Sequence, residues 1–390
     1  MPALEGRRLW FVGIGGAGLS AYAQVARAWG AEVGGWDRNE TPYLAALAGV
    51  SVEIEPEPVV PEGWEVVVSS AYPAVAGRPR AELLAELVSL RRSIVVTGAH
   101  GKTTTSGMIA YCLDRLGLDP AFLIGGEIPQ LGGNARAGGG LLVVEGDESD
   151  RSVAALRPEI AVLLNVDLDH HATFGSRAAV EQLFDDWLSH VPHVVRAEEL
   201  EPVDLELAVR GEHNRVNAAA ALAALELAGV DRGDAARVLT GFAGVGRRLE
   251  PKGSAAGVEV LDSYAHHPAE LAADIAAVRN GGRVLALFQP HLYSRTVHLA
   301  HEFAVALATA DAACVTDIYP AREAPLPGVT GRLIVDGLAA VRPGMRIGWA
   351  PGLDDAARLV AGWARPSDTI LTLGAGDVDR AARRILELVA

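Results

Sequence analysis

The sequence predicts an α/β fold in which mostly parallel sheets are covered by helices. Three observations support this prediction. Short β-branched runs such as WFV and IVVT alternate with Ala- and Leu-rich stretches that have helical spacing. This alternation of strand and helix starts three times, near residues 8, 93 and 257. Polar residues follow many of the strands, at the edge where open α/β sheets bind ligands.

Composition limits the classes of protein that fit this chain. The 390 residues are 50% hydrophobic and 21% charged, which suits two or three domains with separate cores. The net charge of −15 argues against a general nucleic-acid binder, because such a protein needs a basic surface. No apolar run approaches the roughly 20 residues of a membrane span. We therefore expect a cytoplasmic protein with no membrane or nucleic-acid partner, and ordinary core cysteines at Cys112 and Cys314.

The first strand-and-helix segment contains a glycine-rich turn. The strand RRLWFVGIG leads into GIGGAG, Gly13 to Gly18, and a helix follows as far as Gly30. Asp37 ends the next strand, 19 positions after Gly18. This spacing is typical of a site that places a pyrophosphate on the helix N-terminus and a ribose hydroxyl on the acid. A dinucleotide or another nucleotide diphosphate would fit, and close strand–helix packing would explain the same glycines without a ligand.

The second segment begins with a strand and the stretch GAHGKTTT, residues 98–105. Lys102 and Lys252 are the only lysines, although the chain has 34 lysines and arginines in total. Glycines let backbone N–H groups converge on a phosphate, a lysine reaches between β- and γ-phosphates, and Thr103 offers its hydroxyl to Mg²⁺. Arginine is bulkier and planar, so it would not fit the same slot. The stretch predicts an ATP phosphate-binding loop, with a chance match in an ordinary loop as the alternative.

Further polar residues end the strands of this segment. Glu145 ends the strand LLVVE, just before the acids of GDESD, and His170 follows the strand AVLLNVDLD. Beside a phosphate-binding loop, a carboxylate and an imidazole predict Mg²⁺ held between ATP and a second anion. Taken singly, each fits a solvated loop or a helix cap. The stretch GEHNRVNAAAA predicts a helix that opens at Asn214 or Asn217, as a cap or as an amide partner for an adenine edge.

The third segment follows a glycine-rich stretch, FAGVGRRLEPKGSAAG, which is the best candidate for a linker. Within it, Arg247 and Arg248 fit either a surface pair or phosphate contacts. The stretches YAHHP and QPHLYSRT, Tyr264–Pro268 and Gln289–Thr296, each lie just past a strand. Adjacent histidines without a nearby cysteine or H-x₃-H pattern indicate zinc only weakly. Substrate contact or a buried, hydrogen-bonded histidine fits them better.

Together, these motifs resemble the Mur ligase family, in order over nearly the whole chain. The matching stretches are GIGGAG, SSAYP, GAHGKTTT, EGDESD, NVDLDHH, GEHNRVNAAAA, GVGRRLE, DSYAHHP, FQPHLYSRT, DIYPAREAP and GAGD. FQPHLYSRT and the HHP element are similar to the branch that adds alanine. The branch that recycles murein peptides is the alternative.

The resemblance implies three domains. Residues 1–92 would form a Rossmann-like domain that binds a UDP-sugar, in place of the dinucleotide. Residues 93–244 would form a shortened P-loop ATPase domain, and residues 245–390 a Rossmann-like α/β domain that binds the amino acid and closes on ATP. The implied UDP-sugar contacts are Gly15, Gly16, Ala17, Gly18, Asp37 and Ser70.

The implied reaction is ATP-driven amide formation, in peptidoglycan precursor synthesis, by a monomer or homodimer that uses Mg²⁺. It joins L-alanine to the lactyl carboxylate of UDP-N-acetylmuramate through an acyl phosphate. The implied ATP contacts are Gly98, His100, Gly101, Lys102, Thr103, Thr104, Asn214, Asn217 and Arg248. Thr103, Glu145 and His170 match the metal site, and Lys102, Glu145, His170, Arg248 and Asp262 the catalytic set. Tyr264, His266, His267, His291 and Arg295 match the amino-acid side.

The chain also departs from the family pattern. Two aspartates usually precede the Tyr-x-His-His-Pro element, and here they are Asp262 and Ser263. A hydroxyl cannot replace a carboxylate, so either Asp262 substitutes for it or activity is reduced. Ala99 stands where threonine is usual, and Glu212 replaces a common arginine. The stretch 172–210 is short for the family. No other lysine lies between Lys102 and Lys252, so a carbamylated-lysine metal bridge is not available in that span.

Three hypotheses follow. The first is an active ligase, supported by the ordered set of motifs. The second is a nucleotide-binding homologue without turnover, supported by Ser263 and the short central domain. The third is an NAD-dependent oxidoreductase that uses GIGGAG, and it leaves the phosphate-binding loop without a role.

Overall fold

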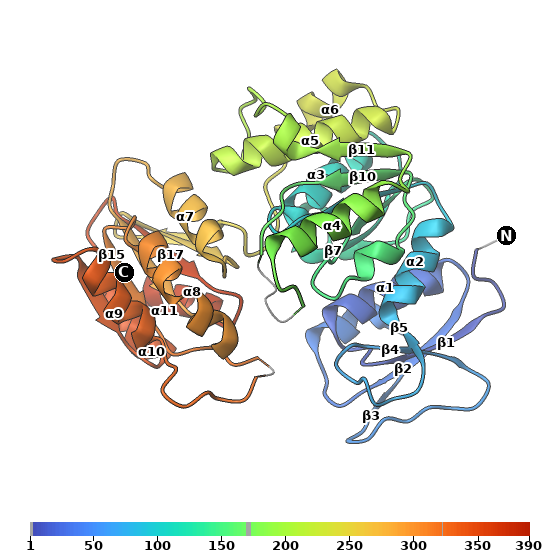
Figure 1. The fold of residues 1–390 in the computed structure, drawn as a ribbon, viewed down its shortest axis with the longest axis horizontal. Helices are drawn as coiled ribbons and strands as arrows, with labels where there is room; N and C mark the ends of the chain where they lie inside the picture. The colour runs from blue at the N-terminus through green and yellow to red at the C-terminus, as the bar shows by residue number, and fades with distance from the viewer. Residues whose placement is uncertain (1–2, 169–172, 322) are drawn as a thin grey trace. The chain divides into compact units, whose positions relative to one another are not determined.

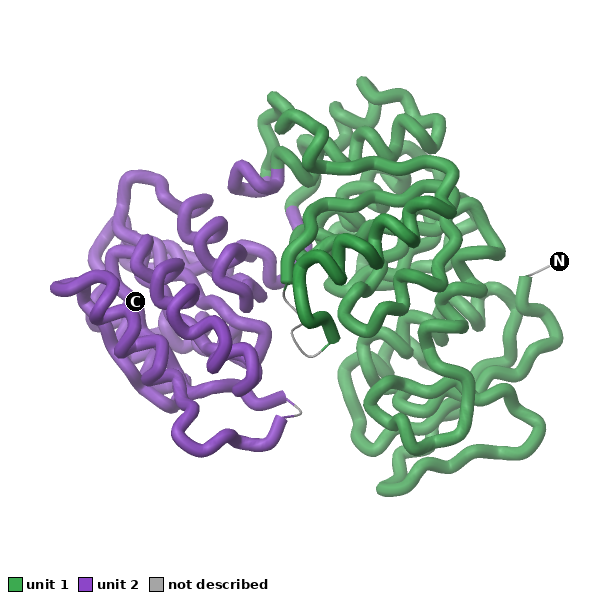
Figure 2. Tube along the Cα trace, viewed as in Figure 1, with its two compact units in different colours: residues 1–208, 215–243 green, residues 209–214, 244–390 purple. Residues whose placement is uncertain are grey.

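The computed structural model describes residues 3–168, 173–321 and 323–390. The chain forms two compact units, shown in different colours in Figure 2. Unit 1 comprises residues 1–208 and 215–243, and unit 2 comprises residues 209–214 and 244–390. Unit 1 carries two sheets and unit 2 carries one (Figure 1).

The first sheet has five strands in the order β3-β2-β1-β4-β5, and all of its pairings are parallel. Helix α1 joins β1 to β2 as expected for a Rossmann-like fold, but β2 to β5 follow one another with only a short 3₁₀ helix, Pro42–Leu47, before β3. The glycine-rich turn joins the central strand β1 to α1. The elements are β1 (Arg8–Val12), α1 (Ala17–Ala28), β2 (Glu32–Asp37), β3 (Ser51–Ile54), β4 (Glu65–Val68), β5 (Arg78–Pro79) and α2 (Arg80–Ser89).

The second sheet has six strands in the order β11-β10-β6-β9-β7-β8, and only β8 runs antiparallel to its neighbour. Its central strands are apolar because helices cover both faces. The elements are β6 (Ser93–Thr97), α3 (Lys102–Arg115), β7 (Ala121–Ile128), β8 (Gly133–Arg136), β9 (Leu142–Glu145), β10 (Ile160–Leu163), α4 (Arg177–Leu188), β11 (His193–Arg196), α5 (Glu212–Leu227) and α6 (Arg232–Leu239).

The third sheet, in unit 2, has six strands in the order β12-β13-β17-β14-β15-β16, with β12 antiparallel. Apolar clusters fill both faces of this sheet. The elements are β12 (Glu250–Ala255), β13 (Val258–Ser263), α7 (Pro268–Ala277), β14 (Val284–Phe288), α8 (Tyr293–Leu307), β15 (Ala312–Val315), α9 (Arg332–Val341), β16 (Arg346–Trp349), α10 (Leu353–Ala361), β17 (Thr369–Leu373) and α11 (Asp379–Val389).

The fold class is confirmed: three mostly parallel sheets carry helices in α/β order. Helix α1 packs against β7 and β8, so the first two sheets share one compact unit. Cys112 and Cys314 are both buried free thiols, and burial raises the pKa of each to about 12. Among the described residues, no helix is both long and apolar enough to cross a membrane.

Candidate active site

The loop between β6 and α3 has the geometry of a phosphate-binding loop. Gly98 and Gly101 adopt φ values of +129° and +88°, which side-chain-bearing residues rarely reach. A Cβ on Gly101 would come within 2.6 Å of Asn217 Oδ1, so this position has no space for a side chain. The loop ends on the first turn of α3, where free backbone N–H groups and the helix dipole favour an anion.

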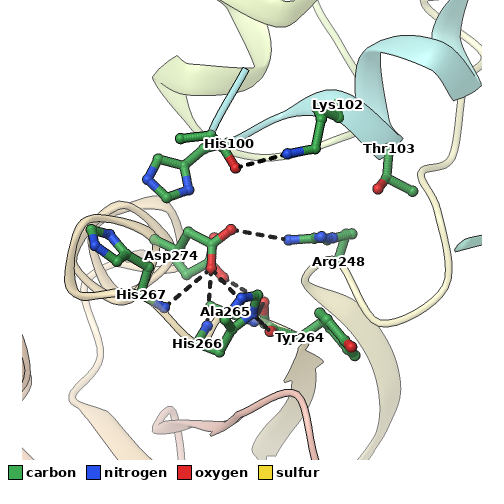
Figure 3. Close-up of polar contacts among 12 residues, drawn as sticks. His100, Lys102, Thr103, Arg248, Tyr264, Ala265, His266, His267 and Asp274 are labelled. Carbon is green, nitrogen blue, oxygen red and sulfur yellow. Dashed lines mark hydrogen bonds and ion pairs between the residues drawn. The ribbon is translucent and has the colours of Figure 1, made fainter. Parts of the chain in front are cut away.

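Lys102 is held inside this loop, with only 15% of its side chain exposed. Its ammonium donates to Gly98 O at 2.5 Å and to both carboxylate oxygens of Glu148 at 3.0 and 3.1 Å. Burial lowers the pKa of Lys102, but Glu148 and Glu145 outweigh burial, so the net pKa is raised. The side chain is therefore a fixed positive charge among the loop carbonyls (Figure 3).

Thr103 and Glu145 lie together at the start of α3 and the end of β9. The Thr103 hydroxyl donates to the Glu145 carboxylate at 3.0 and 3.1 Å, and Gly125 N donates to Glu145 Oε2 at 2.7 Å. A hydroxyl and a carboxylate at this spacing are hard oxygen donors of the kind that Mg²⁺ prefers. The two residues therefore fit the predicted metal site. The third predicted ligand, His170, lies outside the described residues.

Two residues that hold this loop were missed in the sequence. Glu148 is 3% exposed and is the ion-pair partner of Lys102, although the sequence singled out only Glu145 among these acids. Asn165 follows β10, accepts from His100 N at 2.9 Å, and donates to His100 O at 2.9 Å. Both residues lie just past the carboxyl ends of strands, and this position was the available signal.

The glycine-rich turn of the first sheet is tied to Asp37. Asp37 Oδ2 accepts from Gly15 N at 2.8 Å, and Oδ1 accepts from Arg38 N at 2.8 Å. A Cβ on Gly15 would lie 2.9 Å from the same carboxylate, so glycine is needed for this approach. Asp37 is 7% exposed and holds the turn against the end of β2. The ribose contact predicted for Asp37 stays a prediction.

A cation lies beside the first turn of α1. Arg80 begins α2, and its Nη1 lies 3.2 Å from the position of a Cβ on Gly18. Arg80 Nη2 also lies 3.5 Å from Asp150 and 3.7 Å from Asp147, in the acidic stretch after β9. Arg80 could not be predicted from the sequence, because nothing local distinguishes it from other arginines. Ser70 is exposed in the turn after β4, next to β1 in the same sheet.

The two predicted adenine-side asparagines lie in the first turns of α5, which begins at Glu212. Asn214 Nδ2 donates to Arg210 O at 2.6 Å. Because α5 begins at Glu212, Asn214 lies inside the first turn and is not the N-cap, so the capping explanation for Asn214 is wrong. Asn217 is 7% exposed, and its amide oxygen faces Gly101 of the phosphate-binding loop.

In unit 2, Asp262 is fully buried and holds Arg247. Arg247 Nε donates to Asp262 Oδ2 at 2.9 Å, and Thr372 Oγ1 donates to Oδ1 at 2.6 Å. Arg247 also donates to Gly376 O and Gly374 O, both at 2.8 Å. Burial raises the pKa of Asp262, and Arg247 opposes this shift. A catalytic role for Asp262 stays a prediction, and these contacts favour a positioning role.

The loop between β13 and α7 carries Tyr264, His266 and His267 (Figure 3). Glu270 on α7 accepts from His266 N at 2.9 Å and from His267 N at 3.2 Å. Its other oxygen lies 3.5 Å from Arg248 Nη1, and the Arg248 guanidinium lies over the Tyr264 ring. Arg248, the predicted phosphate-side arginine, is thus fixed against the loop.

The predicted amino-acid residues cluster at the carboxyl edge of the third sheet. The His291 ring stacks on Tyr319 with centroids 5.8 Å apart, and Arg295 Nη1 lies 3.4 Å from His291 Nδ1. His266 and His291 have ring centroids 6.1 Å apart. The structure therefore brings together Tyr264, His266 and His291 from two loops of the same unit. Tyr319 also belongs to this cluster, although it was not among the residues predicted from the sequence.

Comparison with protein-family models matches two parts of the chain. Residues 96–195 match the Mur ligase middle domain, and residues 247–376 match the Mur ligase glutamate ligase domain. The first region contains the phosphate-binding loop with Glu145, and the second contains most of the third sheet. The chain belongs to the Mur ligase family.

Individual relatives refine this placement. The UDP-N-acetylmuramate–L-alanine ligase of Streptomyces coelicolor is 40% identical, over 97% of this chain and 96% of the relative. That alignment spans 447 residues against 390 in this chain, so the relative carries segments that this chain lacks. The crystal structure of UDP-N-acetylmuramate-alanine ligase MurC from Thermotoga maritima superposes with a TM-score of 0.79 and 25% identity, covering 97% of this chain and 98% of that one. A murein peptide ligase from Psychrobacter arcticus has a TM-score of 0.63 and 22% identity, covering 98% and 99%.

Proposed function

We propose that this protein is an ATP-dependent ligase that joins L-alanine to the lactyl carboxylate of UDP-N-acetylmuramate. The observation that carries the proposal is the fixed ammonium of Lys102 beside the Thr103–Glu145 pair, at the N-terminus of α3. The similarity to alanine-adding relatives over 97% of the chain supports the choice of substrates.

The phosphate-binding loop and Glu145 beside it would assist phosphate transfer in three ways: through the Lys102 ammonium, through backbone N–H groups, and through bound Mg²⁺. Phosphate oxygens of ATP would compete with Glu148 for the Lys102 ammonium, and loop N–H groups would donate to them. Thr103 and Glu145 would hold Mg²⁺, which when bound neutralises charge between ATP phosphates and a second anion. The chain's own residues thereby lower the electrostatic cost of bringing a carboxylate to a triphosphate.

In the reaction we propose, a carboxylate oxygen of UDP-N-acetylmuramate attacks the γ-phosphorus, and ADP leaves. The resulting acyl phosphate is then attacked by the amine of L-alanine, which loses a proton as phosphate departs. The products are the amide, ADP and inorganic phosphate. Positioning of the three reactants and charge neutralisation would supply most of the rate.

Each unit has a distinct part in this proposal. The turn at Gly15–Gly18, with Arg80 beside it, would bind the UDP diphosphate, because a cation and helix N–H groups converge there. Arg248 would contact phosphate, and Tyr264, His266, His291 and Arg295 would form the amino-acid side.

The test is ADP release measured with each substrate omitted in turn. We expect release only when UDP-N-acetylmuramate, L-alanine and Mg²⁺ are all present, with product mass confirming the amide. Turnover with a murein tripeptide but not with L-alanine would instead support the recycling ligase. No product with any amino acid would contradict the proposal and leave a nucleotide-binding homologue.

A further inference from the structure

A buried carboxylate contacts the serine that ends β13. Ser263 is 0% exposed, and its hydroxyl donates to Asp274 Oδ2 at 2.5 Å. The same hydroxyl accepts from Ala265 N at 3.2 Å. Asp274 lies on α7 and is 9% exposed. The hydroxyl therefore connects this carboxylate to the start of the loop that carries Tyr264, His266 and His267.

Two carboxylates of α7, one helical turn apart, act on this loop. Glu270 accepts the backbone N–H groups of His266 and His267, at the end of the loop. Asp274 reaches the beginning of the loop through Ser263. Residues four positions apart lie on one face of a helix, so both acids face the same loop. The loop is thus held at both ends by carboxyl groups from α7.

The charged groups that face Asp274 come from two elements. Glu270, on the same helix, raises the pKa of Asp274, and Arg248, before β12, lowers it. Arg248 also lies 3.5 Å from Glu270, so it is the cation shared by both acids. Burial is the largest cause and raises the pKa of Asp274 to about 7, although the hydrogen bond from Ser263 acts to lower this pKa.

A buried carboxyl group lowers stability, and such groups are found preferentially at functional sites. An apolar side chain or an amide would remove this cost at position 274. The acid is nevertheless present, buried and hydrogen-bonded to the serine that begins the loop, which points to a role for this carboxyl group.

We propose that Asp274 is a positioning residue of this ligase, and that its carboxyl group acts through Ser263 on the loop between β13 and α7. The carboxyl group lies on α7, and Ser263 links it to the loop. Through Arg248 and this loop it orients groups that the proposed function assigns to ATP and the amino acid, so the inference rests on that function.

The test is a reciprocal exchange across the hydrogen bond. Asp274→Asn keeps an acceptor for the Ser263 hydroxyl but removes the charge, and we expect kcat to fall by about 10-fold or more while the protein stays folded.

Ser263→Asp alone would place two carboxylates at one contact, where only one can ionise, and should also lower kcat and the melting temperature. The double variant Ser263→Asp/Asp274→Ser moves the charge to the strand, and we expect kcat to recover to within about fivefold of wild type. Asp336→Asn, an exposed acid on α9, is the matched control.

The pH profile separates positioning from mere folding. If Asp274 acts through its charge, wild-type kcat should rise as pH increases through about 7, and this limb should be absent in Asp274→Asn and shifted in the exchange variant. Unchanged kcat in Asp274→Asn, a gain of activity in Ser263→Asp alone, or no recovery in the folded exchange variant would each overturn the inference. If wild type forms no product, the proposed function fails. The dissociation constant of Mg-ATP is then measured for the same variants. An unchanged dissociation constant in Asp274→Asn would overturn the inference.

Discussion

Lys102 is the residue whose removal should affect chemistry most. Its ammonium has fixed partners in the loop, and no other lysine except Lys252 exists to replace it. We expect both Lys102→Met and Lys102→Arg to reduce ATP-dependent turnover by on the order of 100-fold or more, because a planar fork cannot occupy the slot of an ammonium. Steady-state ADP release measures this effect.

Lys252→Met is the matched control for Lys102. Lys252 pairs with Glu250 at 2.8 Å on β12, away from the phosphate-binding loop in sequence and in fold unit. Its loss should leave turnover within about twofold of wild type, as expected for a partly exposed ion pair. Equal losses from both lysines would contradict the assignment.

Glu145 should control the requirement for metal. Glu145→Gln keeps the volume and one acceptor but removes the charge opposite Thr103. We expect the Mg²⁺ concentration for half-maximal rate to rise about tenfold or more, and chelation of metal to abolish turnover in wild type. Glu181→Gln, at an exposed pair on α4, serves as the control. A Mg²⁺ titration that is unchanged in Glu145→Gln would remove Glu145 from the metal site.

At the scale of elements, helix α3 has a glycine at each end that tests the loop geometry. Gly101 has φ +88° and no space for a Cβ, whereas Gly117 has φ +73° and no atom within 4 Å. We expect Gly101→Ala to cost about 2 kcal/mol or more in unfolding free energy and to weaken ATP binding, because strain and contact with Asn217 add together. Gly117→Ala should show only the backbone strain, about 1–2 kcal/mol, with normal ATP affinity. Calorimetric ATP titration of both variants measures the difference, and equal affinities would contradict the loop assignment.

Helix α7 should make stability depend on pH through Asp274. The pKa of Asp274 is raised from 3.8 to about 7 in the folded protein, so folding favours its protonated form. Its contribution to stability is fully present below about pH 4 and is lost as pH rises to about 7. Asp274→Asn should therefore be more stable than wild type at pH 8 by at most about 4 kcal/mol, at 1.36 kcal/mol per pKa unit, and not at pH 4. Denaturant unfolding at both pH values measures this, and a stability difference independent of pH would contradict it.

Regular elements were predictable from sequence because their signals are local. A β-branched run predicts the strand before GAHGKTTT, and the glycine turn predicts a helix after it. The structure has β6 and α3 at these positions. The sequence could not single out Glu148, Asn165 and Arg80 as site residues. Each of them contacts a residue more than 40 positions away in the chain, on a different element. Asn214 was misread as a possible cap because the helix begins earlier, at Glu212. The Ser263–Asp274 contact depends on how α7 packs beside β13, which no local pattern reveals.

At the scale of the whole molecule, three sheets each place polar groups at the ends of their strands. Unit 1 holds the glycine turn of the first sheet and the phosphate-binding loop of the second, and unit 2 holds the residues assigned to the amino acid. One polar edge on each of three sheets suits a reaction with three substrates. The diphosphate of the UDP-sugar, the triphosphate of ATP and the amino acid each need different surroundings. The chain keeps these parts although it is shorter than its alignment with the relative from Streptomyces coelicolor.

The most direct test follows oxygen from one substrate to a product. UDP-N-acetylmuramate labelled with ¹⁸O in its lactyl carboxylate is incubated with the protein, ATP, Mg²⁺ and L-alanine, and inorganic phosphate is analysed by mass. Attack of the carboxylate on the γ-phosphorus, followed by loss of phosphate to the amine, transfers one ¹⁸O to each phosphate released. Phosphate without the label, or ATP turnover that does not need the labelled substrate, would contradict the account.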